Sequence, residues 1–262
     1  MIELPVFETI RLELDADLLT ATLARPSRAN AVSRQMLREL IQLADWLDGN
    51  EAVRFLILTG DGPIFAAGQD LREMREPLAD PAQARAAMRA LQRLAQEMML
   101  KLESLEQIAF AVIQGSAYGA GIAIAMTADF RLMADDAVLN LPETNLGMFL
   151  TYGATPRLVS VMGASAAKEF VMFARDMSAS DALRHGLVNV VTPCADLMEA
   201  AVAQVNELRE KDFRSLRITK RIAQAASAVN VGDILVSEPE LCEGTLSDGT
   251  TLELVDRFFA NK

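Results

Sequence analysis

The chain carries two glycine-bearing segments of similar design, Phe65-Ala66-Ala67-Gly68-Gln69-Asp70 and Gly115-Ser116-Ala117-Tyr118-Gly119-Ala120-Gly121. Each segment follows an apolar run typical of a buried strand and precedes a pattern typical of a helix. Glycine allows close backbone approach, so two such loops can aim their backbone N–H groups at one point. Fixed amide donors stabilise the negative charge that develops on a carbonyl oxygen. The two segments therefore predict repeated strand-loop-helix units around an oxyanion site.

On both sides of these segments, the pattern of apolar residues predicts further strands and helices. Ile10–Leu23 has the alternation of a hairpin that turns at Asp15-Ala16-Asp17, and Ser33 is a suitable N-cap for a helix that runs to Leu47. Further strands are predicted at Val53–Leu58, Ile108–Ile113, Phe130–Ala134, Val138–Leu141 and Val188–Val191. Further helices are predicted from Asp70 to Met74, over Pro77–Leu102, and near Arg157–Met162 and Ser165–Ala174.

After Cys194 the pattern becomes almost wholly helical. Helical periodicity covers Asp196–Arg209, Phe213–Ala228 and Val231–Leu241, and no further strand is evident. We therefore expect an α/β core over residues 1–193 and a helical region over residues 194–262.

Composition limits the classes of function. The chain has 262 residues, of which 51% are hydrophobic, and this supplies a large core. A net charge of −11 argues against general binding to nucleic acid or to an anionic membrane, which requires clustered Lys and Arg. With two cysteines and one histidine, His185, a disulfide framework and a cysteine-histidine zinc site are excluded, and no spacing suggests another metal.

Two features bear on localisation. The start, Met1-Ile2-Glu3-Leu4-Pro5, lacks the basic flank and long apolar core of a secretory leader, so we expect a cytoplasmic protein. The uncharged run from Gln107 to Ala128 approaches the ~20 residues of a membrane span. Its glycines favour a buried strand, loop and helix instead.

Glu143 is the candidate acid/base. It is flanked by Leu141, Pro142 and Leu146, so its carboxylate is expected to lie in a partly dry pocket. Burial raises the pKa of a carboxylate toward the pH at which it both takes and gives protons. The alternative is a surface glutamate at the end of a strand.

At this point the motifs resemble the crotonase (enoyl-CoA hydratase/isomerase) superfamily, and the resemblance covers most of the chain. They occur in family order, namely Arg25-Pro26 through Asn30-Ala31, Phe65 through Leu71, Gly115 through Gly121, Pro142-Glu143 with Gly147, and Ala182 through Val188. The resemblance implies a spiral of ββα units with a C-terminal helical trimerisation region, in a homotrimer or a dimer of trimers. It also implies catalysis on acyl-CoA thioesters through an enolate, with no cofactor beyond the coenzyme A of the substrate.

The resemblance assigns roles by position. The oxyanion donors would be the N–H groups of Gln69 and Ala120, and Glu143 would be the catalytic carboxylate. The basic residues Arg25, Arg28 and Arg72 would serve the phosphates of CoA, although each has surface solvation as an alternative. The remaining substrate contacts would come from Ala66, Ala67 and Gly68 at the adenine, and from Gly119, Tyr118 and Tyr152 near the acyl group. For both tyrosines, a packed aromatic ring with a satisfied hydroxyl is at least as good an interpretation.

The chain departs from the hydratase pattern at Ala123, where similar hydratases carry a second glutamate. A single Glu143 favours a proton shuttle between two carbons, which is the chemistry of an enoyl-CoA isomerase. One-glutamate hydration, hydrolysis or decarboxylation stays open.

Two hypotheses from other functional classes also remain open. The spacing Gly115-x-x-x-Gly119-x-Gly121 resembles a dinucleotide-binding turn, but it lies far from the first strand and no Tyr-x-x-x-Lys pair accompanies it. A non-catalytic acyl-CoA-binding protein is the second, and the presence of Glu143 argues against it.

Overall fold

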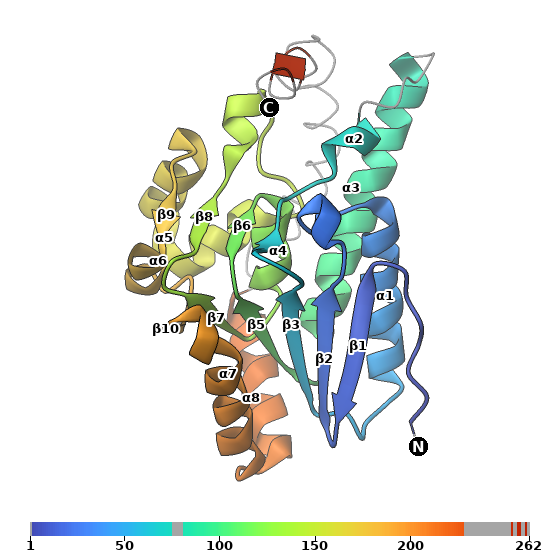
Figure 1. The fold of residues 1–262 in the computed structure, drawn as a ribbon, viewed down its shortest axis with the longest axis vertical. Helices are drawn as coiled ribbons and strands as arrows, with labels where there is room; N and C mark the ends of the chain where they lie inside the picture. Colours follow the sequence, from blue (N-terminus) through green and yellow to red (C-terminus); the bar gives the residue numbers. More distant parts are fainter. Residues whose placement is uncertain (1, 75–80, 228–252, 254–255, 258–259, 261–262) are drawn as a thin grey trace.

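The protein folds as two sheets flanked by helices (Figure 1). The computed structural model describes residues 2–74 and 81–227, together with residues 253, 256–257 and 260. The helix predicted at Val231–Leu241 and the first residues of the one predicted at Pro77–Leu102 lie outside the described residues.

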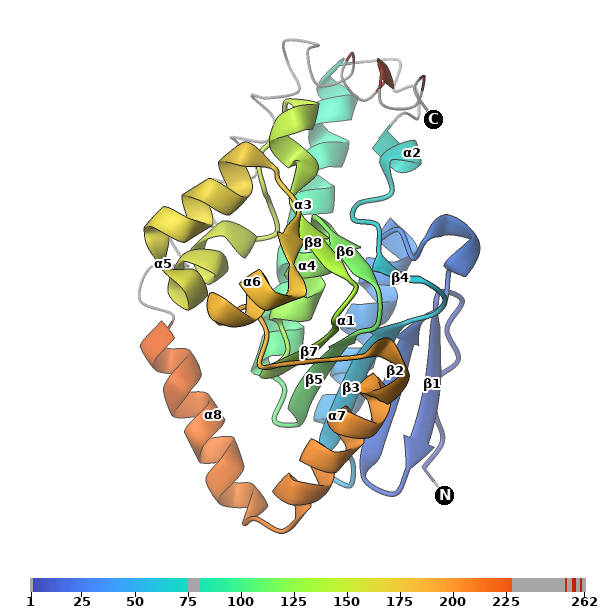
Figure 2. The same cartoon turned by 60° about the vertical axis from the view of Figure 1, so that its left-hand side comes forward.

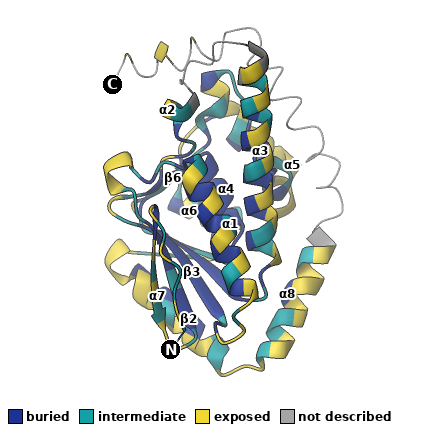
Figure 3. Ribbon diagram, turned by 90° about the vertical axis from the view of Figure 1, so that its right-hand side faces the viewer, coloured by how far each residue is buried: buried dark blue, intermediate teal, exposed yellow. Residues whose placement is uncertain are grey.

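The larger sheet has the strand order β1-β2-β3-β5-β7-β10. Its strands are β1 (Ile10–Asp15), β2 (Leu18–Leu23), β3 (Phe55–Gly60), β5 (Ile108–Ile113), β7 (Phe130–Ala134) and β10 (Val190–Thr192). Strands β1 and β2 pair antiparallel as the predicted hairpin, and the other neighbours pair parallel. Every residue of β3 and β5 is buried, as expected of parallel strands that are covered on both faces; β3 is labelled in Figure 3.

The smaller sheet has the order β4-β6-β8-β9. Strands β4 (Ile64–Ala66), β6 (Ser116–Tyr118) and β8 (Val138–Asn140) are parallel, and β9 (Met177–Ser178) is antiparallel to β8. The chain passes from the larger to the smaller sheet three times, from β3 to β4, from β5 to β6 and from β7 to β8. This alternation confirms the predicted spiral of ββα units.

Helices pack on both faces of the larger sheet and around the smaller one. The helices of the protein are α1 (Arg34–Asp48), α2 (Leu71–Met74), α3 (Pro81–Ser104), α4 (Ala120–Met126), α5 (Ala154–Phe173), α6 (Ala179–Arg184), α7 (Cys194–Arg209) and α8 (Phe213–Ser227), with short 3-10 turns η1 (Pro26–Arg28) and η2 (Pro142–Leu146). In Figure 2, α7 lies in front of this sheet, α1 lies behind it, and α8 leaves α7 at a wide angle. Ser33 caps α1 as predicted, because its side chain accepts a hydrogen bond from the N–H of Met36.

The structure corrects several sequence predictions. Both glycine segments overlap a strand of three residues, β4 or β6, where the sequence pattern predicts a loop. The two helices predicted near Arg157 and Ser165 are confirmed, because α5 consists of two helical parts that meet at a kink at Gly163, with φ 78° and ψ 157°. Strand β9 was not predicted as an element, whereas α6 ends at Arg184 with His185 as its C-cap, which agrees with the helix end expected at His185. Within the described part of the chain, no helix is long and apolar enough to cross a membrane, and Gln107–Ala128 forms β5, β6 and α4.

Candidate active site

Three loops meet at one edge of the smaller sheet. Strands β4, β6 and β8 are parallel neighbours, so the residues after them leave the sheet side by side. The segment after β4 carries Gly68 and Gln69, the segment after β6 carries Gly119 and Ala120, and the segment after β8 carries Glu143. The topology therefore brings the predicted oxyanion donors and the predicted carboxylate to the same edge.

The first loop is held in place by residues 29–32, a role that sequence reasoning missed. The N–H of Val32 donates to the carbonyl oxygen of Gly68 at 2.8 Å, and the N–H of Asp70 donates to that of Val32 at 2.9 Å. Asn30 is fully buried, and its Nδ2 donates at 2.8 Å to the carbonyl oxygens of Asp61 and Ile64. The conformation of residues 67–70 thus depends on residues 29–32, which contribute no predicted catalytic group.

The two glycine loops touch each other. A Cβ atom on Gly68 would lie 3.0 Å from the carbonyl oxygen of Tyr118 and 3.7 Å from the backbone nitrogen of Ala120. Within residues 2–74 and 81–227, the N–H groups of Gln69 and Ala120 donate no hydrogen bond. Unpaired donors on adjacent loops are what an oxyanion site requires.

The glycines of the second loop have separate structural reasons. Gly115 packs on the backbone of Pro63, and a Cβ atom on Gly121 would lie 2.7 Å from the Cβ atom of Ala66. Gly119 has φ 46° and ψ −114°, and a Cβ atom there would overlap Oε1 of Glu143. Gly119 thus brings the backbone against the carboxylate, whereas Gly115 and Gly121 pack the loop against β4.

Glu143 has the environment of an acid/base. It lies in η2, and Gly147, with φ 67°, ends that turn. Its Oε2 atom is buried and has no hydrogen-bond partner within the described residues. Burial raises the pKa of the Glu143 carboxyl to about 7, from an ordinary value of 4.5. The group is therefore poised to exchange protons near neutral pH.

The side chain of Tyr152 contacts Gln69, one of the two predicted oxyanion donors. Its side chain is 3% exposed, and its hydroxyl donates to Oε1 of Gln69. The Nε2 atom of the same carboxamide is buried and has no hydrogen-bond partner within the described residues. This contact was not predicted. Tyr118, the other predicted aromatic, is half-buried at the end of β6.

The three predicted CoA arginines differ in their availability. Arg25 forms an ion pair with Asp70, with Nη2 to Oδ2 at 3.1 Å, and also donates to the carbonyl oxygen of Ala31. Arg28, in η1, and Arg72, in α2, are exposed. Around the predicted adenine contact, Ala66 is buried and Ala67 is exposed.

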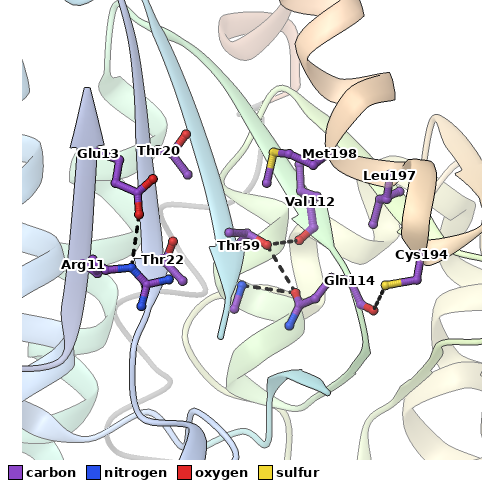
Figure 4. Close-up of a pocket in the computed structure, with 11 residues that line it drawn as sticks. Arg11, Glu13, Thr20, Thr22, Thr59, Val112, Gln114, Cys194, Leu197 and Met198 are labelled. Carbon is purple, nitrogen blue, oxygen red and sulfur yellow. Dashed lines mark hydrogen bonds and ion pairs between the residues drawn. The ribbon is translucent and has the colours of Figure 1, made fainter. Parts of the chain in front are cut away.

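A separate cavity of about 300 Å³ lies over the larger sheet beside α7 (Figure 4). It contains none of the predicted site residues, being lined in part by Arg11, Thr20, Thr59, Gln114 and Cys194. Its polar groups bond to one another: Thr59 Oγ1 donates to the carbonyl oxygen of Val112 at 2.9 Å, and Gln114 Oε1 accepts from the N–H of Gly60 at 3.1 Å. None of the buried polar atoms that lack a partner within the described residues lines this cavity, whereas two of them, on Gln69 and Glu143, belong to the loops at the edge of the smaller sheet, which favours that edge as the reactive site.

Known proteins are similar to this chain in sequence and in fold. Residues 13–253 match the family described as enoyl-CoA hydratase/isomerase. A Bacillus subtilis protein named for this family, YngF, is 40% identical over 181 residues, covering 69% of this chain and 67% of its own. The short-chain-enoyl-CoA hydratase of Clostridium acetobutylicum is 30% identical over 230 residues, covering 87% of this chain and 86% of its own. A Thermobifida fusca structure, titled as an enoyl-CoA hydratase in complex with acetoacetyl-CoA, has 28% identity and a TM-score of 0.77, covering 90% of this chain and 93% of that one. The chain therefore belongs to the enoyl-CoA hydratase/isomerase family of the crotonase superfamily.

Proposed function

We propose that the protein shifts the double bond of an enoyl-CoA thioester through an enolate, with Glu143 as the single acid/base. The observation that carries this proposal is the Glu143 carboxyl, which is buried, has no partner at Oε2 among the residues that the structure describes, and has a pKa of about 7. At such a pKa, both the carboxylate and the carboxylic acid are populated at neutral pH. One group can then remove a proton and return it.

The residue at the position of the hydratases' second glutamate supports a one-base mechanism. That residue is Ala123, which is buried in α4, and its methyl side chain can neither activate nor hold water. A proton shuttle between two carbons needs only Glu143.

The proposed reaction uses groups at the edge of the smaller sheet. The Glu143 carboxylate removes a proton from C2 of a 3-enoyl thioester, and the electron pair moves onto the thioester oxygen. The N–H groups of Gln69 and Ala120 stabilise that oxyanion, each by about 3 kcal/mol. Protonated Glu143 then delivers the proton to C4, which leaves a 2-enoyl thioester and restores the carboxylate.

Coenzyme A is the proposed carrier of the acyl group, and no separate cofactor enters these steps. The complex of the Thermobifida fusca relative with acetoacetyl-CoA supports an acyl-CoA ligand. Exposed Arg28 and Arg72 are the proposed partners of its phosphates, because their guanidinium groups are open to solvent in an otherwise acidic chain. Arg25, which is paired with Asp70, is proposed to order the loop beside them.

Hydration of a 2-enoyl-CoA by Glu143 alone is the second candidate. The hydratase name of the Clostridium acetobutylicum relative favours it. The two candidates differ in their products, since hydration adds one water and isomerisation adds none.

The test is incubation with trans-3-hexenoyl-CoA and, separately, trans-2-hexenoyl-CoA in D2O, with products identified by chromatography and mass spectrometry. Isomerisation predicts 2-hexenoyl-CoA from the 3-enoyl substrate, and loss of this conversion in Glu143→Gln. Addition of water to the 2-enoyl substrate would assign hydration instead. No change in either substrate, despite binding of both, would exclude both candidates.

A further inference from the structure

The carboxamide of Gln69 has an unfilled hydrogen-bond donor inside the candidate site. The residue lies directly after Gly68, at the edge where the three loops meet, and its backbone N–H is the proposed oxyanion donor. Its Nε2 atom is buried, and no group of the described residues accepts a hydrogen bond from it. Buried amide groups in folded proteins are nearly always satisfied, so a bound molecule is the expected acceptor.

Tyr152 determines which end of the carboxamide is left without a partner among the described residues. Its hydroxyl donates to Oε1 of Gln69, which leaves Nε2 as the end turned away from the tyrosine. The backbone of Tyr152 has φ 63°, a left-handed conformation that is uncommon for a bulky side chain. Such a conformation persists only where the surroundings enforce it, and it is concentrated at functional sites.

Contacts made by Arg157 of α5 hold the backbone next to Tyr152. Arg157 Nη1 donates at 2.6 Å to the carbonyl oxygen of Gly153, the residue after Tyr152. The same guanidinium is bound by both carboxylate oxygens of Glu103 in α3, with Nη2 to Oε2 at 2.5 Å. Arg157 is 9% exposed, so this two-pronged ion pair is largely shielded from water. Helix α3 thus anchors the loop that carries Tyr152.

We propose that Gln69 is a specificity-determining residue whose Nε2 donates a hydrogen bond to an oxygen on the acyl chain, and that Tyr152 and Arg157 are positioning residues for it. The proposal rests on the proposed function, because it needs an acyl thioester bound at the N–H of Gln69. That N–H serves the thioester oxygen, so the carboxamide at the far end of the side chain meets acyl atoms beyond the thioester. The preferred substrates are then acyl-CoA thioesters with a hydroxyl or carbonyl oxygen on the acyl chain.

The test compares the affinity of three thioesters, butyryl-CoA, 3-hydroxybutyryl-CoA and 4-hydroxybutyryl-CoA, by titration calorimetry. All measurements use the Glu143→Gln background, so that turnover does not alter the ligands. We expect at least one hydroxylated thioester to bind about tenfold more tightly than butyryl-CoA, since butyryl-CoA leaves Nε2 unpaired. Adding Gln69→Leu should reduce this ratio to about one, and adding Tyr152→Phe should reduce it in part.

Gln92→Leu is the matched control, because it removes another buried carboxamide, located in α3, whose Oε1 also lacks a partner in the described residues. It should leave the affinity ratio unchanged. Equal affinity for the three thioesters, or a ratio that Gln69→Leu does not alter, would overturn this inference alone. Failure to bind any thioester would overturn the proposed function and this inference with it.

Discussion

Glu143 combines burial with a carboxylate oxygen that has no hydrogen-bond partner within the described residues, and this raises its pKa to about 7. A general base must be ionised in the free enzyme, so kcat/KM for the isomerisation of 3-hexenoyl-CoA should fall about tenfold per pH unit below this pKa. The measurement is the pH–rate profile from pH 5 to 9. Glu143→Gln should lower kcat/KM by about 10²–10⁴-fold and remove the acidic limb. A profile that is flat across this range would contradict the assignment of Glu143 as the base.

The same residue should make folding stability depend on pH. Between its ordinary pKa of 4.5 and about 7, the folded protein holds a proton on Glu143 that the unfolded chain has released. The contribution of Glu143 to the free energy of unfolding therefore decreases as pH rises through this window and is constant above it.

A neutral glutamine avoids this loss, so Glu143→Gln should gain stability relative to the wild type by on the order of 2 kcal/mol more at pH 8 than at pH 5. Urea unfolding at the two pH values measures the difference. An equal difference at both pH values would show that the carboxyl of Glu143 titrates normally in the folded state.

Among the structural elements, the second glycine loop and α5 allow a prediction that separates backbone strain from a steric clash with Glu143. Gly119 has φ 46°, and a Cβ atom would overlap the Glu143 carboxylate. Gly163, within α5, has φ 78° and no atom within 4 Å of such a Cβ. Gly119→Ala and Gly163→Ala should therefore each lose about 1–3 kcal/mol of unfolding free energy to backbone strain.

Only Gly119→Ala should also displace Glu143 and abolish turnover of 3-hexenoyl-CoA. Thermal unfolding and kinetics on the two variants measure these effects. Equal retention of activity in both variants would show that the loop does not hold the carboxylate.

The elements that sequence could predict are those with a long apolar pattern. The central strand predicted at Ile108–Ile113 has the same bounds in the structure, and that predicted at Val53–Leu58 is shifted by two residues. Strands β4 and β6 were not predicted because their residues lie in or next to the glycine segments, which the sequence pattern predicts as loops, whereas β8, which also has three residues, was predicted within Val138–Leu141. The break in α5 depends on the backbone conformation of Gly163, although the two predicted segments already ended on either side of it.

The candidate site shows a similar division. Glu143 and the glycine loops stand out locally in sequence, so they could be singled out before the structure was known. The hydrogen bond from Tyr152 to Gln69 joins residues 83 apart, and the ion pair of Arg157 with Glu103 joins residues 54 apart. Neither partner has a local pattern that identifies the other. Sequence therefore indicated the reacting groups, whereas their support required the three-dimensional structure.

In the whole molecule, α8 packs Phe213 and Leu216 against the core but leaves other apolar side chains exposed. Some of its polar side chains also contact the rest of the protein: Lys220 Nζ donates at 2.7 Å to the carbonyl oxygen of Gln107, and Arg217 and Arg221 pair with Glu106. Its apolar residues Ile218 and Ile222 are 48% and 66% exposed, on a helix that stands apart from α7 (Figure 2). Exposed apolar faces of this kind are typical of subunit interfaces.

This face supports the prediction of a trimer or a dimer of trimers, formed through the C-terminal helical region. Light scattering after size exclusion should give three or six times the chain mass of 28.5 kDa. The double substitution Ile218→Glu and Ile222→Glu places charges on the interface and should shift the mass toward that of a single chain. Val6→Glu is the control, because Val6 is 96% exposed but lies in the N-terminal segment before β1, so its assembly should match the wild type. If the double variant assembles as the wild type does, the exposed face of α8 is not the interface; a wild type with the mass of one chain would contradict the oligomer itself.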